Sequence, residues 1–467
     1  MAPHNAVRTC SRLRTIRICA AAACGLSALM ATPARAQDSH YWNLFYGTYP
    51  TLLGGTVIGS PSDLSGSYYN PGFRPASKTG ELLLAAQLYQ YERLSLEGNA
   101  GTKIPLSGSS LSVSPSLVAG NFPGTDTSST DRFTYSLLAR QHVNFDIEGR
   151  LAFGGTSMGS ASTSELILSQ NLSEYWAGFT WTRQFSRIWS AGVSNYVAFR
   201  SQTQRLGFSV RQFNDTTATT SALNYTSLID YFHVRLLWKL GVGYAEDRFS
   251  GGATVTTPSL SILGSGEYYL DQGLEGYPPE PTFFAASSQK DLTPAYRSSW
   301  AVGAGLAYTF DDVKVYLSAE WYAPVSRYSI LNTQDFVAAS TGNTVSTAVV
   351  QELRSVFNYG AGIEIFPGKP WSILASFVTD QSAVDPDVEN TTSFSAWDLY
   401  HIAGGGIATF GRYRLTLGGA ITIGSGNART LAELASLIGE TTGLVKSTAF
   451  EGNYFRGQLV AALSVSL

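Results

Sequence analysis

The sequence predicts an all-β protein, a transmembrane antiparallel β-barrel of about 14 strands with an N-terminal hatch (plug) segment inside the lumen. Three observations indicate this fold. Apolar and polar residues alternate over unusually long stretches, short connections alternate with long ones, and only 14% of the 467 residues are charged while 12% are aromatic. Soluble domains are about one quarter charged. A barrel whose outer face contacts lipid needs few charges and shows its apolar signal over many short strands.

Residues 1–36 have the features of a secretion signal. Four arginines precede an apolar run over 18–31, and Ala34-Arg35-Ala36 is a small-x-small cleavage site. All three cysteines lie in this segment, which excludes a disulfide scaffold, a cysteine metal site and a cysteine nucleophile in the mature protein. Cleavage removes five arginines and no acidic residue, which takes the formal net charge from −3 to −8. Such an acidic chain is a poor partner for nucleic acid.

The remaining chain divides into a hatch over 37–80 and a barrel over 81–467. Period-2 alternation defines the barrel strands, since side chains of a strand point alternately to its two faces. The predicted strands cover 81–93, 108–120, 131–153, 172–185, 188–213, 221–244, 247–264, 296–310, 313–332, 351–366, 370–381, 397–410, 412–425 and 452–467.

Two strands carry candidate ligand-binding residues on their polar face. Between Phe133 and Phe153 the odd positions are mostly apolar, and the even positions hold every charge. In the strand over 221–244, large apolar residues again alternate with cations. The predicted lumen residues are Arg140, His142, Arg150, His233, Arg235 and Lys239. They could anchor a carboxylate head group, or simply solvate a pore and pair with acids such as Asp146 and Glu148.

The connections support a barrel that spans the outer membrane. Tight turns fall near 186, 245–246, 311–312, 367–369 and 411, and each is flanked by aromatic residues, as expected of a girdle at one membrane interface. Long loops are predicted at 154–171, 265–295, 333–350, 382–396 and 426–451, with a short helix over 428–438. The second of these loops carries apolar residues that suit either capture of a hydrophobic ligand or packing against neighbouring loops: Tyr268, Tyr269, Leu270, Phe283 and Phe284.

The hatch has its own pattern, because it is rich in small, apolar and aromatic residues and ends in a turn formed by Asn70-Pro71-Gly72. A mobile N-terminal tail is the alternative. The stretch from Asp63 to Gly72 resembles the hatch motif of the FadL/TodX-type outer-membrane transporters of long-chain fatty acids and other hydrophobic compounds. The stretch 256–267 resembles a mid-barrel strand of that family. The residues that match the hatch motif are Asp63, Tyr69, Asn70, Pro71 and Gly72, with glycine at a position where the family usually has alanine.

This resemblance implies passive transport of hydrophobic compounds, long-chain fatty acids or aromatic hydrocarbons, through a plugged barrel in the Gram-negative outer membrane. We expect a monomer that contacts membrane lipid and lipopolysaccharide, with a hydrophobic small molecule as substrate. The four histidines after the signal are widely separated, and the sequence contains no HExxH or P-loop motif. We therefore predict no enzyme, no metal and no cofactor. A surface barrel that transports nothing, such as an adhesin, is the competing function.

Overall fold

The computed structural model describes residues 40–73, 80–98, 106–122, 130–153, 160–214, 218–276, 282–384, 397–427 and 450–467. The signal peptide predicted over 1–36 and the helix predicted over 428–438 lie outside these residues. In the described part of the chain, no helix is long and apolar enough to cross a membrane.

Strands make up nearly all of the regular structure, and one short helix, α2 (Gly66–Tyr69), lies in the N-terminal segment. The strands are β1 (Glu81–Gly98), β2 (Leu106–Asn121), β3 (Asp131–Phe153), β4 (Ser160–Gln184), β5 (Trp189–Asn214), β6 (Thr219–Glu246), β7 (Phe249–Thr256), β8 (Leu260–Glu275), β9 (Phe283–Leu292), β10 (Ala301–Thr309), β11 (Val313–Tyr322), β12 (Val325–Leu331), β13 (Phe336–Val337), β14 (Thr344–Val345), β15 (Val349–Leu353), β16 (Val356–Ile365), β17 (Trp371–Asp380), β18 (Leu399–Phe410), β19 (Tyr413–Asn427) and β20 (Phe450–Ser466).

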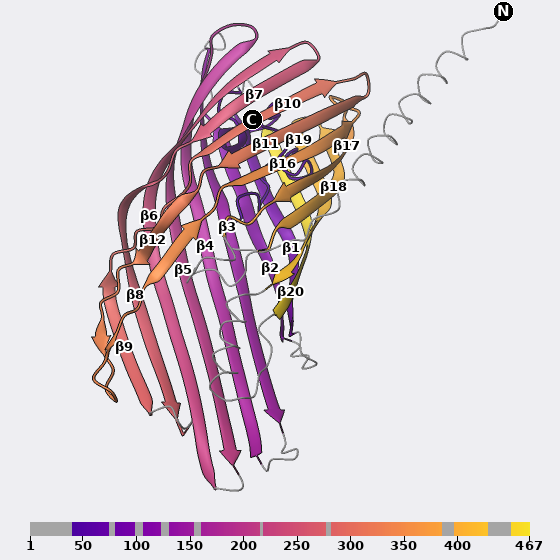
Figure 1. The fold of residues 1–467 in the computed structure, drawn as a ribbon. Coiled ribbons are helices and arrows are strands. Elements are labelled where there is room, and N and C mark those ends of the chain that lie inside the picture. The colour runs from indigo at the N-terminus through magenta and orange to yellow at the C-terminus, as the bar shows by residue number, and fades with distance from the viewer. Residues whose placement is uncertain are drawn as a thin grey trace, which may run out of the picture.

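Fourteen of the described strands form a closed antiparallel ring (Figure 1). The chain runs around the ring from β1 to β7 and continues through β10, β11 and β16 to β20, which pairs with β1. Strand β6 links the two parts of the ring. One edge of β6 pairs with β5 along nearly the whole length of β6, and the other edge pairs with β7. The predicted fold class, a transmembrane barrel of about 14 strands, is confirmed.

The prediction of long loops at 154–171 and 265–295 is wrong for most of both segments. Strand β4 already begins at Ser160, and β8 and β9 form a hairpin that pairs with the outer half of β6. Beyond the membrane both faces of a strand can contact water, so lipid no longer imposes an apolar outer face. Backbone pairing continues there without the alternation on which the strand predictions relied.

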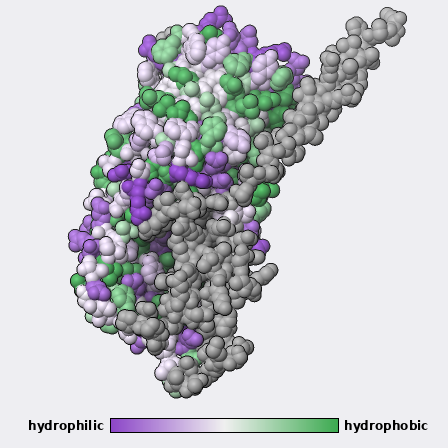
Figure 2. Space-filling model, viewed as in Figure 1, coloured by the Kyte–Doolittle hydropathy of each residue, from purple (hydrophilic) through white to green (hydrophobic). Residues whose placement is uncertain are grey.

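The outer surface of the ring is apolar near the short turns. Aromatic residues flank these turns and contact each other in pairs, among them the exposed Trp189 with the half-buried Tyr244 and the half-buried Phe366 with the exposed Trp371, at 5.0 and 4.8 Å between ring centroids. Figure 2 shows a band of apolar and weakly polar residues on the visible face, between hydrophilic residues at the top and at mid-height. An apolar band with aromatic rings at its border is the expected lipid-facing surface.

The wall of the barrel is strongly uneven in length. Strands β3 to β6 have 23 to 28 residues, whereas β10, β11, β16 and β17 have 9 or 10. In Figure 1 the long strands extend far below the rest of the ring, and the short turns gather at the opposite end. A 28-residue strand is roughly 90 Å long, so this wall extends well beyond a bilayer core of about 30 Å.

Candidate functional site: the barrel interior

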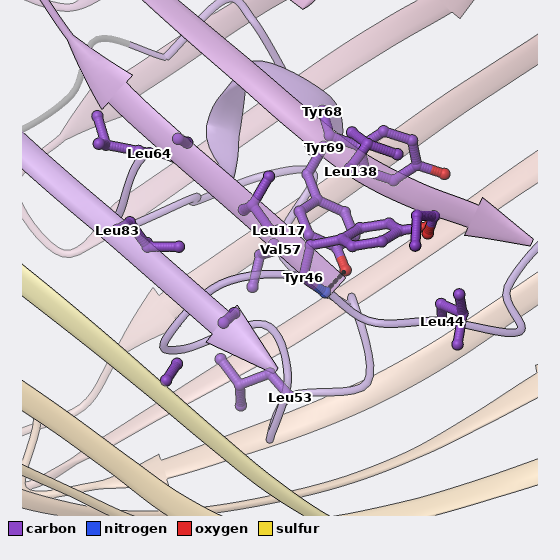
Figure 3. Packing of buried hydrophobic residues seen from close by; sticks show 14 of the residues in the cluster. Leu44, Tyr46, Leu53, Val57, Leu64, Tyr68, Tyr69, Leu83, Leu117 and Leu138 are labelled. Atoms are coloured by element: carbon purple, nitrogen blue, oxygen red, sulfur yellow. Dashed lines mark hydrogen bonds between the residues drawn. The ribbon is translucent and has the colours of Figure 1, made fainter. Parts of the chain in front are cut away.

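The N-terminal segment, residues 40–73, is packed inside the ring of strands. Its aromatic side chains are buried together with inward-facing leucines of β1, β2 and β3, such as Leu83 and Leu138 (Figure 3). The Tyr69 hydroxyl accepts a hydrogen bond of 3.0 Å from the backbone nitrogen of Tyr46, which joins the two ends of the segment. The segment thus has a compact fold of its own, and its core is shared with the wall.

A buried carboxylate organises the first turns of this segment. Asp63 accepts hydrogen bonds from the backbone nitrogen and hydroxyl of Thr48, at 2.5 and 2.6 Å, and from the backbone nitrogen of Tyr49 at 3.3 Å. The backbone nitrogen of Ser65, at 2.9 Å, and its hydroxyl donate to the other oxygen. Hydrogen bonds to a charged acceptor are stronger than neutral ones. Asp63 therefore ties two loops of the segment together.

The turn formed by Asn70, Pro71 and Gly72 rests directly on the backbone of the wall. The Asn70 amide nitrogen donates to the carbonyl oxygens of Ile58, at 2.9 Å, and Val242, at 3.0 Å, and its side-chain oxygen accepts from the Gly72 nitrogen at 2.8 Å. A Cβ atom at Gly72 would lie 2.7 Å from backbone atoms of β6. The glycine that departs from the family pattern is thus required by close contact.

The wall has matching glycines under this turn, which we call the glycine seat: Gly192 on β5, Gly241 on β6 and Gly252 on β7. A Cβ atom added to any of the three would overlap the turn. Backbone of the wall lies against the Pro71 carbonyl at Gly192 and against the Asn70 side-chain amide at Gly241 and Gly252, so the contact leaves almost no room for adjustment.

Hydrogen bonds attach the segment to strands around the whole ring, not to one side of it. Most of them join a wall side chain to a backbone carbonyl or nitrogen of the segment. The wall residues that take part include Ala139, Thr182, Ser194, Val242, Ser318, Ser376 and Arg456, on β3, β4, β5, β6, β11, β17 and β20 respectively. Each such bond contributes about 1 kcal/mol net.

A β-bulge at Arg140 corrects the predicted faces of β3. Ala139 pairs with Tyr175 and Gln141 with Glu174, so Arg140 is the extra residue. One extra residue reverses the facing of every side chain beyond it. Val143 is 1% exposed, whereas Asp146, Glu148 and Arg150 are exposed, the opposite of the predicted arrangement. Arg140 itself points into the barrel and is 7% exposed.

Four inward-facing cations form a cation–aromatic cluster beside the N-terminal segment: Arg140, Arg200, Arg235 and Lys239, with the rings of Tyr68, Trp176 and Tyr296 and the carboxylates of Glu174 and Glu320. Two of the cations share one carboxylate. Glu174 forms salt bridges with Arg200, at 3.0 Å, and with Arg235, at 2.7 Å. Lys239 pairs with Glu320 at 3.4 Å.

Arg140 is the member of the cluster that forms no salt bridge with the described residues. Its guanidinium carbon lies 5.9 Å from the ring centroid of Tyr68 and 5.5 Å from that of Trp176, and its buried Nη1 has no hydrogen-bond partner. Burial raises the pKa of Tyr68 to about 12, so the phenol stays neutral beside the cation. A buried cation without a carboxylate partner has unused capacity to bind an anion.

A chamber of about 50 Å³ borders the cluster, and both the wall and the N-terminal segment contribute to it. Tyr41 and Tyr68 come from the segment, while Arg140, Trp176 and Lys239 come from the wall. The volume accommodates one or two water molecules or a small head group, but not an alkyl chain.

The other predicted lumen residues lie apart from the chamber. His233 is buried and its Nε2 lies 2.8 Å from the hydroxyl of Ser261. His142, beyond the bulge, lies 3.4 Å from Ser173, and Arg150 is a surface residue paired with Glu165 at 2.7 Å. Of the six predicted lumen residues, only Arg140, Arg235 and Lys239 lie together at the chamber.

The five candidates for a capture loop are divided between two faces of the β8–β9 hairpin. Tyr268 and Leu270 are buried in a cluster with residues of β6 and β12, such as Ile229 and Leu331. Tyr269 and Phe284 are exposed, and Phe283 is partly buried. Of the five candidate residues, Tyr268 and Leu270 therefore pack against neighbouring strands and are not available to capture a ligand.

The sequence prediction named three of the nine residues of the cluster, Arg140, Arg235 and Lys239, and missed the other six. Glu174 and Arg200 stand at inward positions of β4 and β5. The sequence carried a signal for both, because each is a charged residue between neighbours that face outward. Tyr296 is the first residue of the strand predicted over 296–310, whereas in the structure it lies between β9 and β10.

Solved structures share this fold. The toluene transporter TodX of Pseudomonas putida matches with a TM-score of 0.53 at 13% identity, covering 91% of this chain and 98% of that chain. A FadL homologue of Pseudomonas aeruginosa gives 0.55 at 12% identity, with 90% and 100% covered, and the toluene transporter TbuX of Ralstonia pickettii gives 0.53 at 12%, with 91% and 98%. No protein-family model and no curated protein sequence matches the chain. The likeness confirms the FadL/TodX-type fold.

Proposed function

We propose that this protein is a passive outer-membrane transporter of hydrophobic compounds, in which residues 37–80 act as the hatch. The observation that carries the proposal is the chamber between the N-terminal segment and the cation–aromatic cluster, because a ligand bound there touches the hatch and the wall together. The proteins of the same fold support it, since they include transporters of toluene. The role is not enzymatic.

The unpaired guanidinium favours substrates with an anionic head group. Arg140 lies against the chamber, and the three other cations of the cluster already have carboxylate partners. A carboxylate in the chamber would complete the charge pairing around Arg140, with the rings of Tyr68 and Trp176 beside it. We infer that long-chain carboxylic acids are better ligands than hydrocarbons of equal size.

Replacing Arg140 by Gln tests this preference. A charge-assisted hydrogen bond contributes roughly 1.5–3 kcal/mol, so affinity for a long-chain fatty acid should fall about 10- to 150-fold. Binding of a neutral hydrocarbon of similar length should hardly change, as measured by calorimetry on the detergent-solubilised protein. Arg150→Gln is the matched control, because its exposed ion pair with Glu165 lies apart from the chamber. Equal losses for both ligands would instead indicate distortion of the barrel.

Transport on this scheme requires the N-terminal segment to move, because the chamber is too small for an alkyl chain. A disulfide between segment and wall tests this requirement. The Cβ of Leu53 lies 3.5 Å from the position of a Cβ atom on Gly362 of β16, at the edge of the disulfide range of about 3.5–4.5 Å. The mature chain contains no other cysteine, so the pair Leu53→Cys and Gly362→Cys gives one defined bond.

The oxidised double variant should take up radiolabelled fatty acid several-fold more slowly than the same protein after reduction, in cells or in liposomes. Each single variant serves as control for the lost packing at Leu53 and the added side chain at position 362. Uptake that is equally fast with the bond formed would contradict a moving hatch. A correctly assembled barrel that takes up no hydrophobic compound under either condition would favour the non-transporting surface barrel.

A further inference from the structure

A second cavity lies at the short-turn end of the barrel, beside the turn between β18 and β19. It has a volume of about 250 Å³ and is bounded by the β18–β19 turn, the adjoining ends of β1 and β20, and Ser62 of the segment. This volume equals roughly eight water molecules in the liquid, several times that of the chamber. Its lining is mostly polar hydroxyl groups and charged side chains.

Two arginines give this cavity an excess of positive charge. The Arg414 guanidinium lies 5.2 Å from the ring centroid of Tyr49 in the N-terminal segment, its buried Nε has no hydrogen-bond partner, and it forms no salt bridge with the described residues. Arg412, in the turn, stacks on Tyr413 at 5.1 Å and donates to its hydroxyl at 2.9 Å. Glu81 is the one carboxylate of the lining, and it accepts a hydrogen bond of 2.5 Å from Ser464.

We propose that this cavity is an anion-binding site that takes the carboxylate of a hydrophobic acid as the acid leaves the barrel. The Arg414 guanidinium can bind a carboxylate through two parallel N–H groups, and the Arg412 guanidinium supplies further donors. The carboxylate assignment rests on the proposed transport function, in which the same acid first binds beside Arg140. The contact with Tyr49 places the site against the segment that the acid must pass.

Calorimetry with dodecanoate on the full-length mature protein, in a non-ionic detergent, tests the proposal. We expect two sites in the wild type, one lost or weakened about 10- to 150-fold in Arg414→Gln and the other in Arg140→Gln. Arg414→Lys should retain part of the affinity, because it keeps the charge without the paired N–H groups. The matched control is Arg248→Gln, in another turn at the same end, where the arginine pairs with Asp311 at 3.1 Å. Gel mobility of unheated samples confirms that each variant is folded.

The outcomes separate this inference from the proposed function. Loss of a site in Arg140→Gln with two unchanged sites in Arg414→Gln would overturn the second site and leave the transport proposal intact. The reverse result would support the second site and contradict the head-group role of Arg140. Inorganic phosphate that displaces dodecanoate from the Arg414 site at equal or lower concentration would overturn the carboxylate as its occupant.

Discussion

Single residues decide how the N-terminal segment is held, and they do so by two different means. Asp63 holds the segment internally, through hydrogen bonds to two loops. Gly72 holds it externally, because its missing side chain lets the turn lie on the backbone of β6. The first means is electrostatic and directional, and the second is purely steric. A substitution at either position should therefore release the segment without changing the strands of the ring.

Gly72→Ala should displace the Asn70-Pro71-Gly72 turn from the glycine seat. A Cβ atom 2.7 Å from backbone atoms cannot be accommodated without movement, and overpacking of this kind costs about 1–3 kcal/mol. We expect faster proteolysis of the N-terminal segment and higher permeability to small polar antibiotics. Gly66→Ala is the matched control, since a Cβ atom there would be 3.4 Å from Pro61, an ordinary contact. Identical behaviour of the two variants would contradict a steric role for the seat.

At the scale of elements, alternation predicted the ring strands and the inward face of β6, because lipid requires one apolar face per strand. The bulge in β3 was hidden from the same reasoning. Odd positions stay mostly apolar on both sides of Arg140, yet the facing reverses there. Outside the membrane a charged residue can face outward at no cost, so the composition of β3 is compatible with either register. Side-chain placement beyond Arg140 therefore depended on pairing with β4.

Deletion of Arg140 should leave β3 correctly paired. Ala139 and Gln141 already oppose consecutive residues of β4, Tyr175 and Glu174, so removing the residue between them produces a regular ladder with both faces unchanged. The variant should fractionate with the outer membrane and show the gel shift of a folded barrel on heating. Deleting Val143 instead reverses the facing of the outer part of β3, and we expect poor assembly. A deletion of Arg140 that fails to assemble would contradict the bulge.

The whole molecule combines a ring of fourteen strands with an interior occupied by its own N-terminal segment. Barrels of eight strands are filled by their side chains, while sixteen or more leave a water channel. Here leucines and tyrosines of the segment complete the core together with inward residues of the wall. The segment therefore occupies space that the wall side chains alone would leave to water.

Deletion of residues 37–80 should convert the barrel into an open pore. The ring closes through pairing of β1 with β20, which does not involve the segment, so the strands should still assemble. In planar lipid bilayers we expect steady ion conductance that is absent from the wild type, and in cells increased sensitivity to small polar antibiotics. An assembled deletion variant that conducts no ions would show that the wall closes the barrel without the segment.

The double role of Tyr68 has a thermodynamic consequence. This residue belongs to the segment that fills the barrel, and it also lines the chamber beside Arg140. Ligand occupancy and the position of the segment are therefore linked equilibria, and linkage is reciprocal. A ligand that favours the displaced segment by a given factor must bind the displaced form more tightly by that same factor. Gly72→Ala, which loosens the segment at a distance from the chamber, should accordingly raise the affinity for such a ligand.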